Sequence, residues 1–428
     1  MFQHFLNVRE RINFPERMRA VFLGNMNNFP FGIAKELKKR GYETKLYLDT
    51  HKDYILDRPE STDLLLKDNY PKWIIQLGSR YLGFKRAVFL LLPNIFYRKL
   101  IAEINSYDIV FLNGEWFRIG KYISPNKFVI GLFAGYDLEI ADQNLVNKFA
   151  ENSRSKNRFT KKIPLLFYRT IWKRSIQMQI EGVKRVNLVN YYLPEINPIG
   201  DEILQKIKNN LKYSRLFLRG FDTSLFDYNE PEIAKEKFII LSVTRFFFTT
   251  KRVDNKRNDI MIKGIALFVE KNNITKDLEI IFFEKGDDLE IAKKMCVDLK
   301  IAKFVKWIPI IPLYDLKPYF AKCDVAFDQL GEQWVGAGLF SMLAGRPLIA
   351  NGRTDLYKKY LGEDIPVCQA LNEEEVCAWL TKLYTNRNLI KEIGLKSRNF
   401  ILKYYNMGNE INFYKKEFES FQRNEKLN

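Results

Sequence analysis

Residues 327–351, FDQLGEQWVGAGLFSMLAGRPLIAN, carry the strongest indication of the fold. The pattern predicts a strand end, a glycine-containing loop, an apolar helix and a second short strand. The loop holds one carboxylate, Glu332, and two glycines, Gly336 and Gly338. A helix start offers free backbone N–H groups and the positive end of its dipole, and a glycine lets a phosphate approach closely. The stretch therefore predicts a phosphate-binding turn, although both glycines are equally consistent with packing positions.

Short apolar strands alternate with helical segments along the rest of the chain. Arg19–Leu23 is followed by a helix over 31–40 and a strand at 42–48, which is how a parallel α/β sheet begins. The same pattern restarts at 238–244 after the polar linker at 227–237. We therefore predict the α/β fold class, with two Rossmann-like domains facing across a cleft. The expected boundaries are 1–225, 226–408, and a C-terminal helix over 409–428. Further strands are predicted at 107–113, 128–134, 185–191 and 215–218, and a helix with Asn372 as its N-cap at 373–385.

Composition limits the class of protein. The chain has 428 residues, of which 46% are apolar and 28% charged, as in ordinary soluble proteins. Its four cysteines form no CxxC pair, which indicates reduced cytoplasmic thiols. With two histidines, a histidine-rich metal site is not expected. The N-terminal residues lack a signal-peptide core, and the longest apolar stretch, 87–97, is shorter than the roughly 20 residues that span a bilayer. We expect a cytoplasmic protein.

The positive charge is concentrated in the first half. Residues 1–225 hold 37 Lys and Arg against 22 Asp and Glu, whereas residues 226–428 hold 32 against 29. A basic compositional bias would affect both halves alike. The asymmetry indicates that the first half works beside something anionic.

Two stretches of that half combine basic and aromatic residues. Residues 154–175 carry eight Lys and Arg and no acid, interleaved with large apolar side chains, and residues 80–100 repeat the pattern. Such segments suit an anionic bilayer surface, so we predict peripheral attachment to the inner face of the cytoplasmic membrane. The alternative is that the apolar residues pack in the core and only the charges are exposed. No nucleic-acid-binding motif accompanies the charge, so no nucleic-acid partner is expected.

The stretch 327–351 also resembles the donor-sugar segment of two-domain GT-B glycosyltransferases, in the retaining group 1. The resemblance rests on the lead-in Asp328-Gln329-Leu330, on Glu332, and on the helix ending Ser341-Met342-Leu343-Ala344-Gly345-Arg346-Pro347. That family has two glutamates eight positions apart, the first facing the sugar and the second usually the ribose. Glu332 fits the first position, but the second falls on Phe340. Phe340 and Met342 are expected on the buried face of the helix, so Ser341 or backbone groups would hold the ribose.

A second similarity lies around the first strand of the second domain. Arg245 matches the arginine that ends this strand in the family, and Lys256 matches the lysine that opens the next helix. The resemblance implies that both neutralise the donor diphosphate, with Lys251 competing with Lys256. Without the resemblance, these residues would be a solvated loop with several lysines. Trp334 is a candidate wall for the sugar ring, and the turn around Trp307 falls where the family reads the nucleobase, mainly through main-chain atoms.

Candidate acceptor residues lie in the first domain. The turn after the first strand lacks GxGxxG spacing, and its Asn27 and Asn28 either contact donor or acceptor or satisfy turn geometry. The loop from Gly135 to Glu139 resembles the family's acceptor-side loop. Asp137 is the candidate to orient or deprotonate the acceptor hydroxyl, with Glu139 in reserve. A helix-capping role for Asp137 is equally consistent with the sequence.

The implied activity is transfer of a sugar from a nucleotide-diphosphate donor to a hydroxyl of a growing, lipid-linked glycan, as in lipopolysaccharide or capsule synthesis. The resemblance further implies retention of configuration, no cofactor and no metal. It also implies that the C-terminal helix over 409–428 returns to the first domain. Two alternatives stay open. Phe340 in place of the second glutamate is consistent with a non-catalytic scaffold or partner subunit, and sugar-nucleotide epimerases share the fold.

Overall fold

The structure is a computed structural model that describes residues 18–49, 55–67, 69–78, 89, 91–139, 160–162, 164–208, 218–250, 255–332 and 335–427. These residues form two compact units. The first takes in the described chain up to Asp222 together with the segment from Met407 onward, and the second is Thr223–Asn406. Each unit is described by itself.

The first unit is built on a six-stranded parallel sheet in the order β3-β2-β1-β4-β5-β6. This is the strand order of a Rossmann fold. Its strands are β1 (Arg19–Leu23), β2 (Glu43–Leu48), β3 (Ile74–Gln76), β4 (Ile109–Asn113), β5 (Phe128–Leu132) and β6 (Leu188–Asn190). At its centre Ala20 pairs with Thr44 on one side and with Ile109 on the other. Apart from Arg19 and Asn113 at strand ends, the central strands β1, β4 and β5 carry no polar side chain, as expected for strands that helices cover on both faces.

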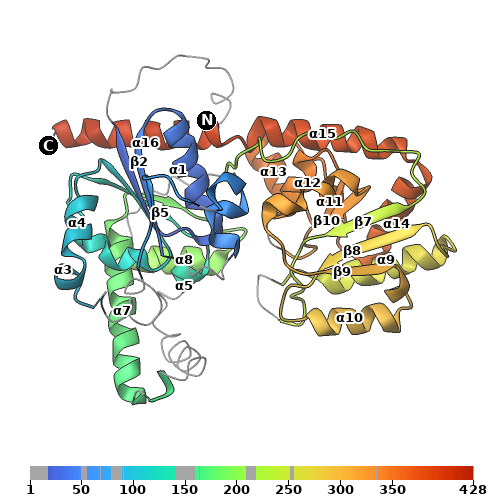
Figure 1. Ribbon diagram of the computed structural model, residues 1–428, viewed down its shortest axis with the longest axis horizontal. Coiled ribbons are helices and arrows are strands. Elements are labelled where there is room, and N and C mark those ends of the chain that lie inside the picture. Colours follow the sequence, from blue (N-terminus) through green and yellow to red (C-terminus); the bar gives the residue numbers. More distant parts are fainter. Residues whose placement is uncertain are drawn as a thin grey trace. The chain divides into compact units, whose positions relative to one another are not determined.

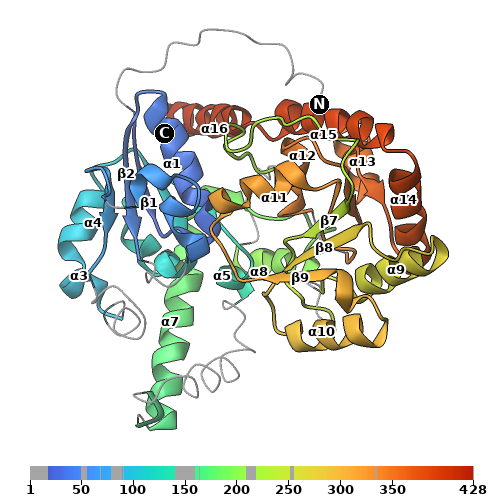
Figure 2. The same cartoon turned by 45° about the vertical axis from the view of Figure 1, so that its right-hand side comes forward.

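Alternate residues of β1 and β4 divide the core of this unit into two layers. Ala20 and Phe22 belong to the layer under α1 (Phe29–Lys39) and α16 (Met407–Leu427). Val21 and Leu23 belong to the opposite layer. Figures 1 and 2 show α1 and α16 on one side of the sheet and α7 on the other. The remaining helices of this unit are η2 (Met26–Asn28), η3 (Ile55–Asp57), η4 (Pro59–Ser61), η5 (Leu64–Leu66), α3 (Pro93–Phe96), α4 (Arg98–Ile104), η7 (Gly114–Tyr122), α5 (Tyr136–Glu139), η9 (Thr160–Lys162), α7 (Leu165–Arg185) and α8 (Pro198–Ile207).

The second unit repeats the architecture. Its parallel sheet has the order β12-β11-β10-β7-β8-β9, the same Rossmann order counted from β7. The strands are β7 (Phe238–Ser242), β8 (Leu278–Phe283), β9 (Val305–Ile308), β10 (Val325–Phe327), β11 (Leu348–Ala350) and β12 (Cys368–Gln369). The helices are α9 (Asn258–Lys271), α10 (Leu289–Asp298), η10 (Ala302–Phe304), η11 (Leu313–Leu316), α11 (Lys317–Lys322), α12 (Gly338–Leu343), α13 (Thr354–Leu361), α14 (Glu373–Thr385) and α15 (Asn388–Tyr404).

These two sheets confirm the predicted α/β class with two Rossmann-like units. The N-cap prediction is also confirmed, because the Asn372 side chain accepts a hydrogen bond from the Glu375 N–H at the start of α14. The predicted strand at 215–218 lies outside the described residues except for Leu218, which is not in a strand.

Candidate functional site

The carboxyl edge of the second sheet brings the predicted donor-binding residues together. β7 and β10 are neighbours there, although two strands and their helices separate them along the chain. In doubly wound sheets such a switch in strand order opens a crevice that holds ligands. The loops after these two strands carry Arg245, Lys256 and Glu332. The candidate site is therefore the carboxyl edge around β7 and β10.

A buried carboxylate organises this edge. Asp328, one residue past β10, is 5% exposed. Its Oδ2 accepts hydrogen bonds from the N–H groups of Gly336 (2.7 Å) and Gly338 (2.8 Å). Its Oδ1 accepts from the Gln329 N–H (2.8 Å) and from the Thr244 hydroxyl (3.3 Å). The two glycine N–H groups that the sequence offered to a phosphate are thus bound by a carboxylate of the protein itself.

Gly336, Gly338 and Ser341 therefore have structural roles in this segment. A Cβ on Gly338 would lie 2.7 Å from Leu348, so this glycine permits close packing, whereas a Cβ on Gly336 would meet only the Asp328 carboxylate, at 3.9 Å. The predicted ribose contact of Ser341 does not fit the structure. The Ser341 side chain is completely buried, and its hydroxyl donates to the Gly338 carbonyl (2.7 Å). The apolar character of α12 draws Ser341 into the core, away from any ligand at the edge.

Two predicted cations, Arg245 and Lys256, lie on the loop after β7 at this edge. Arg245 is exposed and stacks over the Phe247 ring, 5.2 Å from its centroid. Lys256 is half-buried, and its ammonium donates to Gln329 Oε1 (2.5 Å). Backbone bonds from Lys256 N–H to the Phe247 carbonyl (2.6 Å) and from Leu330 N–H to the Lys256 carbonyl (3.0 Å) fix this position. The alternative cation, Lys251, lies outside the described residues.

Lys285 is a third cation at this edge, and the sequence reasoning missed it. It follows β8 by two residues, and its carbonyl accepts a hydrogen bond from the Phe246 N–H (2.7 Å). Burial lowers the pKa of Lys285, the charge of Arg245 lowers it further, and Asp328 acts in the opposite direction. The available sequence signal was a lysine just beyond a strand end, followed by Gly286, which has a φ of 113°.

The backbone beside Glu332 is fixed from two sides. Arg353 donates to the Glu332 carbonyl (2.9 Å), and Asn351 donates to the Gly331 carbonyl (3.0 Å). A Cβ on Gly331 would lie 2.0 Å from the Asn255 carbonyl oxygen. Glu332 is exposed. Its carboxylate is thus presented on a held backbone, while Trp334 lies outside the described residues.

Packing side chains occupy two of the remaining predicted positions. Met342 is completely buried, as expected, and Phe340 is half-buried against Phe226, with ring centroids 5.5 Å apart. Phe340, at the position of the family's second glutamate, thus makes an aromatic packing contact. Trp307 lies in β9 and packs against Phe246 and Phe282, at 5.5 and 5.4 Å. Its side chain therefore supports the sheet beside Phe246.

Asn27 and Asn28 follow β1 in the first unit, and both have a positive φ, 57° and 56°. Asn28 is buried, and its amide donates to the hydroxyls of Ser61 (3.1 Å) and Thr62 (2.9 Å). It also accepts a hydrogen bond from Asn25 (2.8 Å). Asn27 is exposed and holds its turn through its backbone N–H. These contacts match the turn-geometry alternative.

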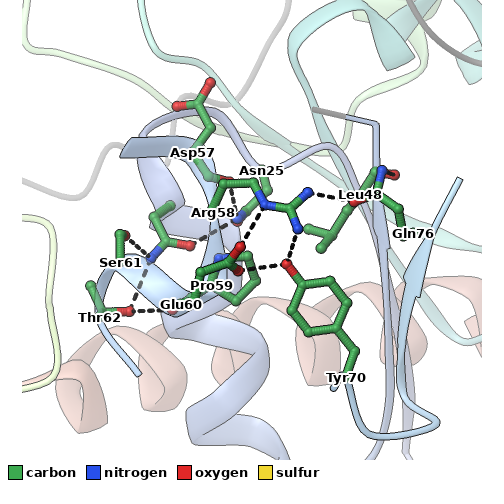
Figure 3. Close-up of polar contacts among 11 residues, drawn as sticks. Asn25, Leu48, Asp57, Arg58, Pro59, Glu60, Ser61, Thr62, Tyr70 and Gln76 are labelled. Atoms are coloured by element: carbon green, nitrogen blue, oxygen red, sulfur yellow. Dashed lines mark hydrogen bonds and ion pairs between the residues drawn. The ribbon is translucent and has the colours of Figure 1, made fainter. Parts of the chain in front are cut away.

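The neighbouring Arg58 completes this polar cluster (Figure 3). Its guanidinium binds Glu60 Oε1 (2.9 Å) and Gln76 Oε1 (2.6 Å) and donates to the Tyr70 hydroxyl. Tyr70 in turn donates to Glu60 Oε2 (2.5 Å). The carboxylate, hydroxyl and amide around Arg58 thus bind one another and fasten η4 to the edge of the sheet.

Asp137 is the most buried of the predicted acceptor-side residues. Its carboxylate accepts from the N–H groups of Ala134 (2.9 Å), Gly135 (3.0 Å) and Gly114 (3.3 Å). Burial raises its pKa to about 6. These contacts match the capping alternative. Gly135 has a φ of 113°, and Glu139 is the last residue of α5.

Comparisons with known proteins identify the fold. No family model and no curated protein matches the sequence. Among solved structures, HepE from Anabaena in complex with UDP and glucose has a TM-score of 0.59 at 13% identity, over 95% of this chain and 100% of that one. Sucrose-phosphate synthase from Thermosynechococcus elongatus gives 0.58 at 11%, over 94% and 100%. WaaG, a glycosyltransferase involved in lipopolysaccharide biosynthesis, gives 0.52 at 13%, over 89% and 94%. The chain has the GT-B glycosyltransferase fold.

Proposed function

We propose that this protein is a glycosyltransferase that takes its sugar from a nucleotide-diphosphate donor. The observation that carries the proposal is the pair Arg245 and Lys256 at the carboxyl edge of a GT-B unit. Arg245 follows Thr244, whose hydroxyl donates to Asp328, and Lys256 donates to Gln329, the residue after Asp328. The solved structures of HepE contain UDP and UDP-glucose, which supports this donor class.

The proposed chemistry is stabilisation of a leaving diphosphate. Charge builds on the diphosphate as its bond to the sugar breaks, and fixed cations stabilise that charge. Arg245 and Lys256 would bind it, and Glu332 would face the transferred sugar. Retention of configuration and independence from metal and cofactor belong to the same proposal. Asp137 would hold the acceptor-side loop through its three backbone contacts.

A thermal-shift screen against UDP, GDP, ADP, CDP and their sugar conjugates tests the donor class. A ligand that binds only the folded state raises the melting temperature by mass action. We expect a shift with one base. A flat response from folded protein would favour the non-catalytic partner subunit, which the aromatic Phe340 and the buried Ser341 also favour.

Measuring turnover distinguishes a catalytic glycosyltransferase from a non-catalytic scaffold. With the nucleotide sugar found in the screen, Glu332→Ala and Lys256→Ala are expected to lose turnover, while Lys271→Met, at the far end of α9, serves as the matched control. A chelator should leave the rate unchanged. A rate that survives both substitutions would contradict the assigned site, and a rate abolished by the chelator would contradict metal independence.

We further propose that the acceptor is lipid-linked, and the start of α7 supports this. Leu166 and Phe167 are 78% and 60% exposed, beside the exposed Lys161 and Lys162. Tyr168 is buried, so part of this stretch does pack in the core. A second group of exposed apolar residues, Leu92, Ile95 and Phe96, precedes the exposed Arg98 and Lys99. Residues 80–88, 90, 154–159 and 163 of the two basic stretches lie outside the described residues.

Exposed apolar side chains beside lysines suit the surface of an anionic membrane. No helix among the described residues is long and apolar enough to cross one. Flotation with vesicles of anionic lipid should carry the wild type, and the double variant Leu166→Ser, Phe167→Ser should float less. Equal flotation with neutral and anionic vesicles would contradict the membrane proposal.

A further inference from the structure

Lys285 lies on a loop that is fastened to the loop carrying Arg245. Besides the bond between the Phe246 N–H and the Lys285 carbonyl, the Asp288 N–H donates to the Phe246 carbonyl (3.1 Å). The Asp288 carboxylate accepts from the N–H groups of Phe248 (2.5 Å) and Thr249 (2.9 Å). The segment after β8 therefore cannot move independently of the segment after β7.

Gly286 makes this close approach possible. A Cβ at this position would lie 2.2 Å from the Phe246 carbonyl oxygen, and its φ of 113° disfavours any side chain. The Lys285 backbone is thereby held directly against the segment 245–249. The position of Lys285 beside Arg245 is consequently a built feature of the fold and is not left to a flexible loop.

Lys285 lies within reach of charges of both signs. Arg245 and Lys285 repel each other, and the carboxylate that acts on Lys285 is Asp328. That carboxylate already accepts from three backbone N–H groups and the Thr244 hydroxyl. Lys256 lies at the same edge, where its ammonium donates to Gln329. Cations held close together in this way are stabilised when an anion binds between them.

We propose that Lys285 is a third diphosphate-binding cation of the donor site, acting with Arg245 and Lys256 from the carboxyl end of β8. The assignment rests on the proposed function for the identity of the ligand. The chemistry that Lys285 recognises is a pair of linked phosphates, in a nucleotide sugar or in the nucleoside diphosphate left after transfer. The extra negative charge of the product makes its hold strongest as the leaving group departs.

Calorimetric titration of the whole protein with inorganic pyrophosphate and with the nucleoside diphosphate of the screen tests the assignment. Lys285→Met keeps the length of the side chain and removes its charge, and should weaken both ligands about tenfold or more, as expected for a hydrogen bond between charged groups. Lys285→Arg and the control Lys271→Met should bind as the wild type does. The unphosphorylated nucleoside should bind all four proteins alike, and matching melting curves without ligand verify folding.

The outcomes separate the two claims. If Lys285→Met binds pyrophosphate and nucleoside diphosphate as tightly as the wild type, the role of Lys285 is overturned while the proposed function stands on Arg245 and Lys256. If the wild type binds pyrophosphate in a Lys285-dependent way but turns over no nucleotide sugar, the anion site stands and the proposed function fails. A wild type that binds neither ligand overturns both.

Discussion

Asp328 is the residue on which the donor site depends most. Its carboxylate ties the loop after β10 to Gly336 and Gly338 and, through Thr244, to the loop after β7. Its charge also acts on Lys285, where it opposes the larger effects of burial and of Arg245, both of which lower the pKa of Lys285. One side chain thus holds two loops in register and partly offsets the cations beside them.

Replacing Asp328 by Asn should therefore weaken both the fold and the site. An amide keeps one acceptor oxygen but turns an NH₂ group toward backbone N–H donors, which leaves at least one of them without a partner. We expect a loss of about 2–3 kcal/mol in the free energy of unfolding, measured by urea denaturation. Asp277→Asn, at an exposed position before β8, is the matched control. Equal stabilities of the two variants would rule out the organising role of Asp328.

At the scale of elements, α7 and α16 depend on opposite kinds of contact. α7 lies backbone to backbone against η7, because a Cβ on Gly182 would come within 1.6 Å of the Phe117 carbonyl oxygen. α16 is held instead by a buried polar group. Glu410 accepts from the Gly220 N–H (2.7 Å) and from Tyr414 (2.5 Å).

The substitution Gly182→Ala should disturb the packing of α7 against η7. Alanine favours a helix by up to about 1 kcal/mol over glycine, but here the added methyl group must push the helix away from η7. We expect a net loss of about 1–3 kcal/mol, the usual cost of overpacking, in chemical denaturation. In α1, the Cβ of Gly32→Ala would meet only the end of the flexible Met407 side chain, at 3.1 Å. Stabilisation by both substitutions would contradict the close packing of α7.

Glu410 makes the attachment of α16 depend on pH. Burial raises its pKa from 4.5 to about 7. The folded state therefore keeps a proton that the unfolded chain has already released between these values. The contribution of Glu410 to the free energy of unfolding is highest below about pH 4.5, falls as the pH rises toward 7, and is then constant. At about 1.4 kcal/mol per pKa unit, the effect is on the order of 3 kcal/mol.

The Glu410→Gln variant should lose this dependence. The difference in melting temperature between variant and wild type is expected to shift in favour of the variant as the pH rises from 5 to 8. Asp137, whose pKa burial raises to about 6, contributes with the same sign but is present in both proteins. A difference that stays constant over this range would show that Glu410 titrates as an ordinary carboxylate.

At the scale of the whole molecule, periodicity was enough to predict both sheets, since apolar strands covered on two faces leave a clear pattern. The strand and helix pattern also located the loops after β7 and β10, and the resemblance to the GT-B family singled out Arg245, Lys256 and Glu332 within them. It could not show that Asp328 occupies the glycine N–H groups, or that Ser341 turns inward, because both depend on contacts made across the fold. Lys285 was missed because its neighbours Phe246, Arg245 and Asp328 are 39 to 43 positions away along the chain.

Arg346 illustrates the same limit. The sequence placed it in the segment that resembles the family, and the structure buries it completely. Its guanidinium donates to the carbonyls of Cys323 (2.9 Å), Asn229 (2.6 Å) and Gly345 (3.2 Å). The arginine therefore joins the loop before β11 to the segment before β7. A motif can locate such a residue, but only the three-dimensional contacts distinguish a structural role from a ligand-binding one.

The most direct measurement is the calorimetric affinity of the nucleoside diphosphate for the wild type and for the double variant Arg245→Met, Lys256→Met, with Lys271→Met as the control. Loss of two charged partners should weaken binding at least about 100-fold, while the control binds as the wild type does. An unchanged affinity in the double variant, or no binding to the wild type, would contradict the placement of the donor at the carboxyl edge of β7 and β10.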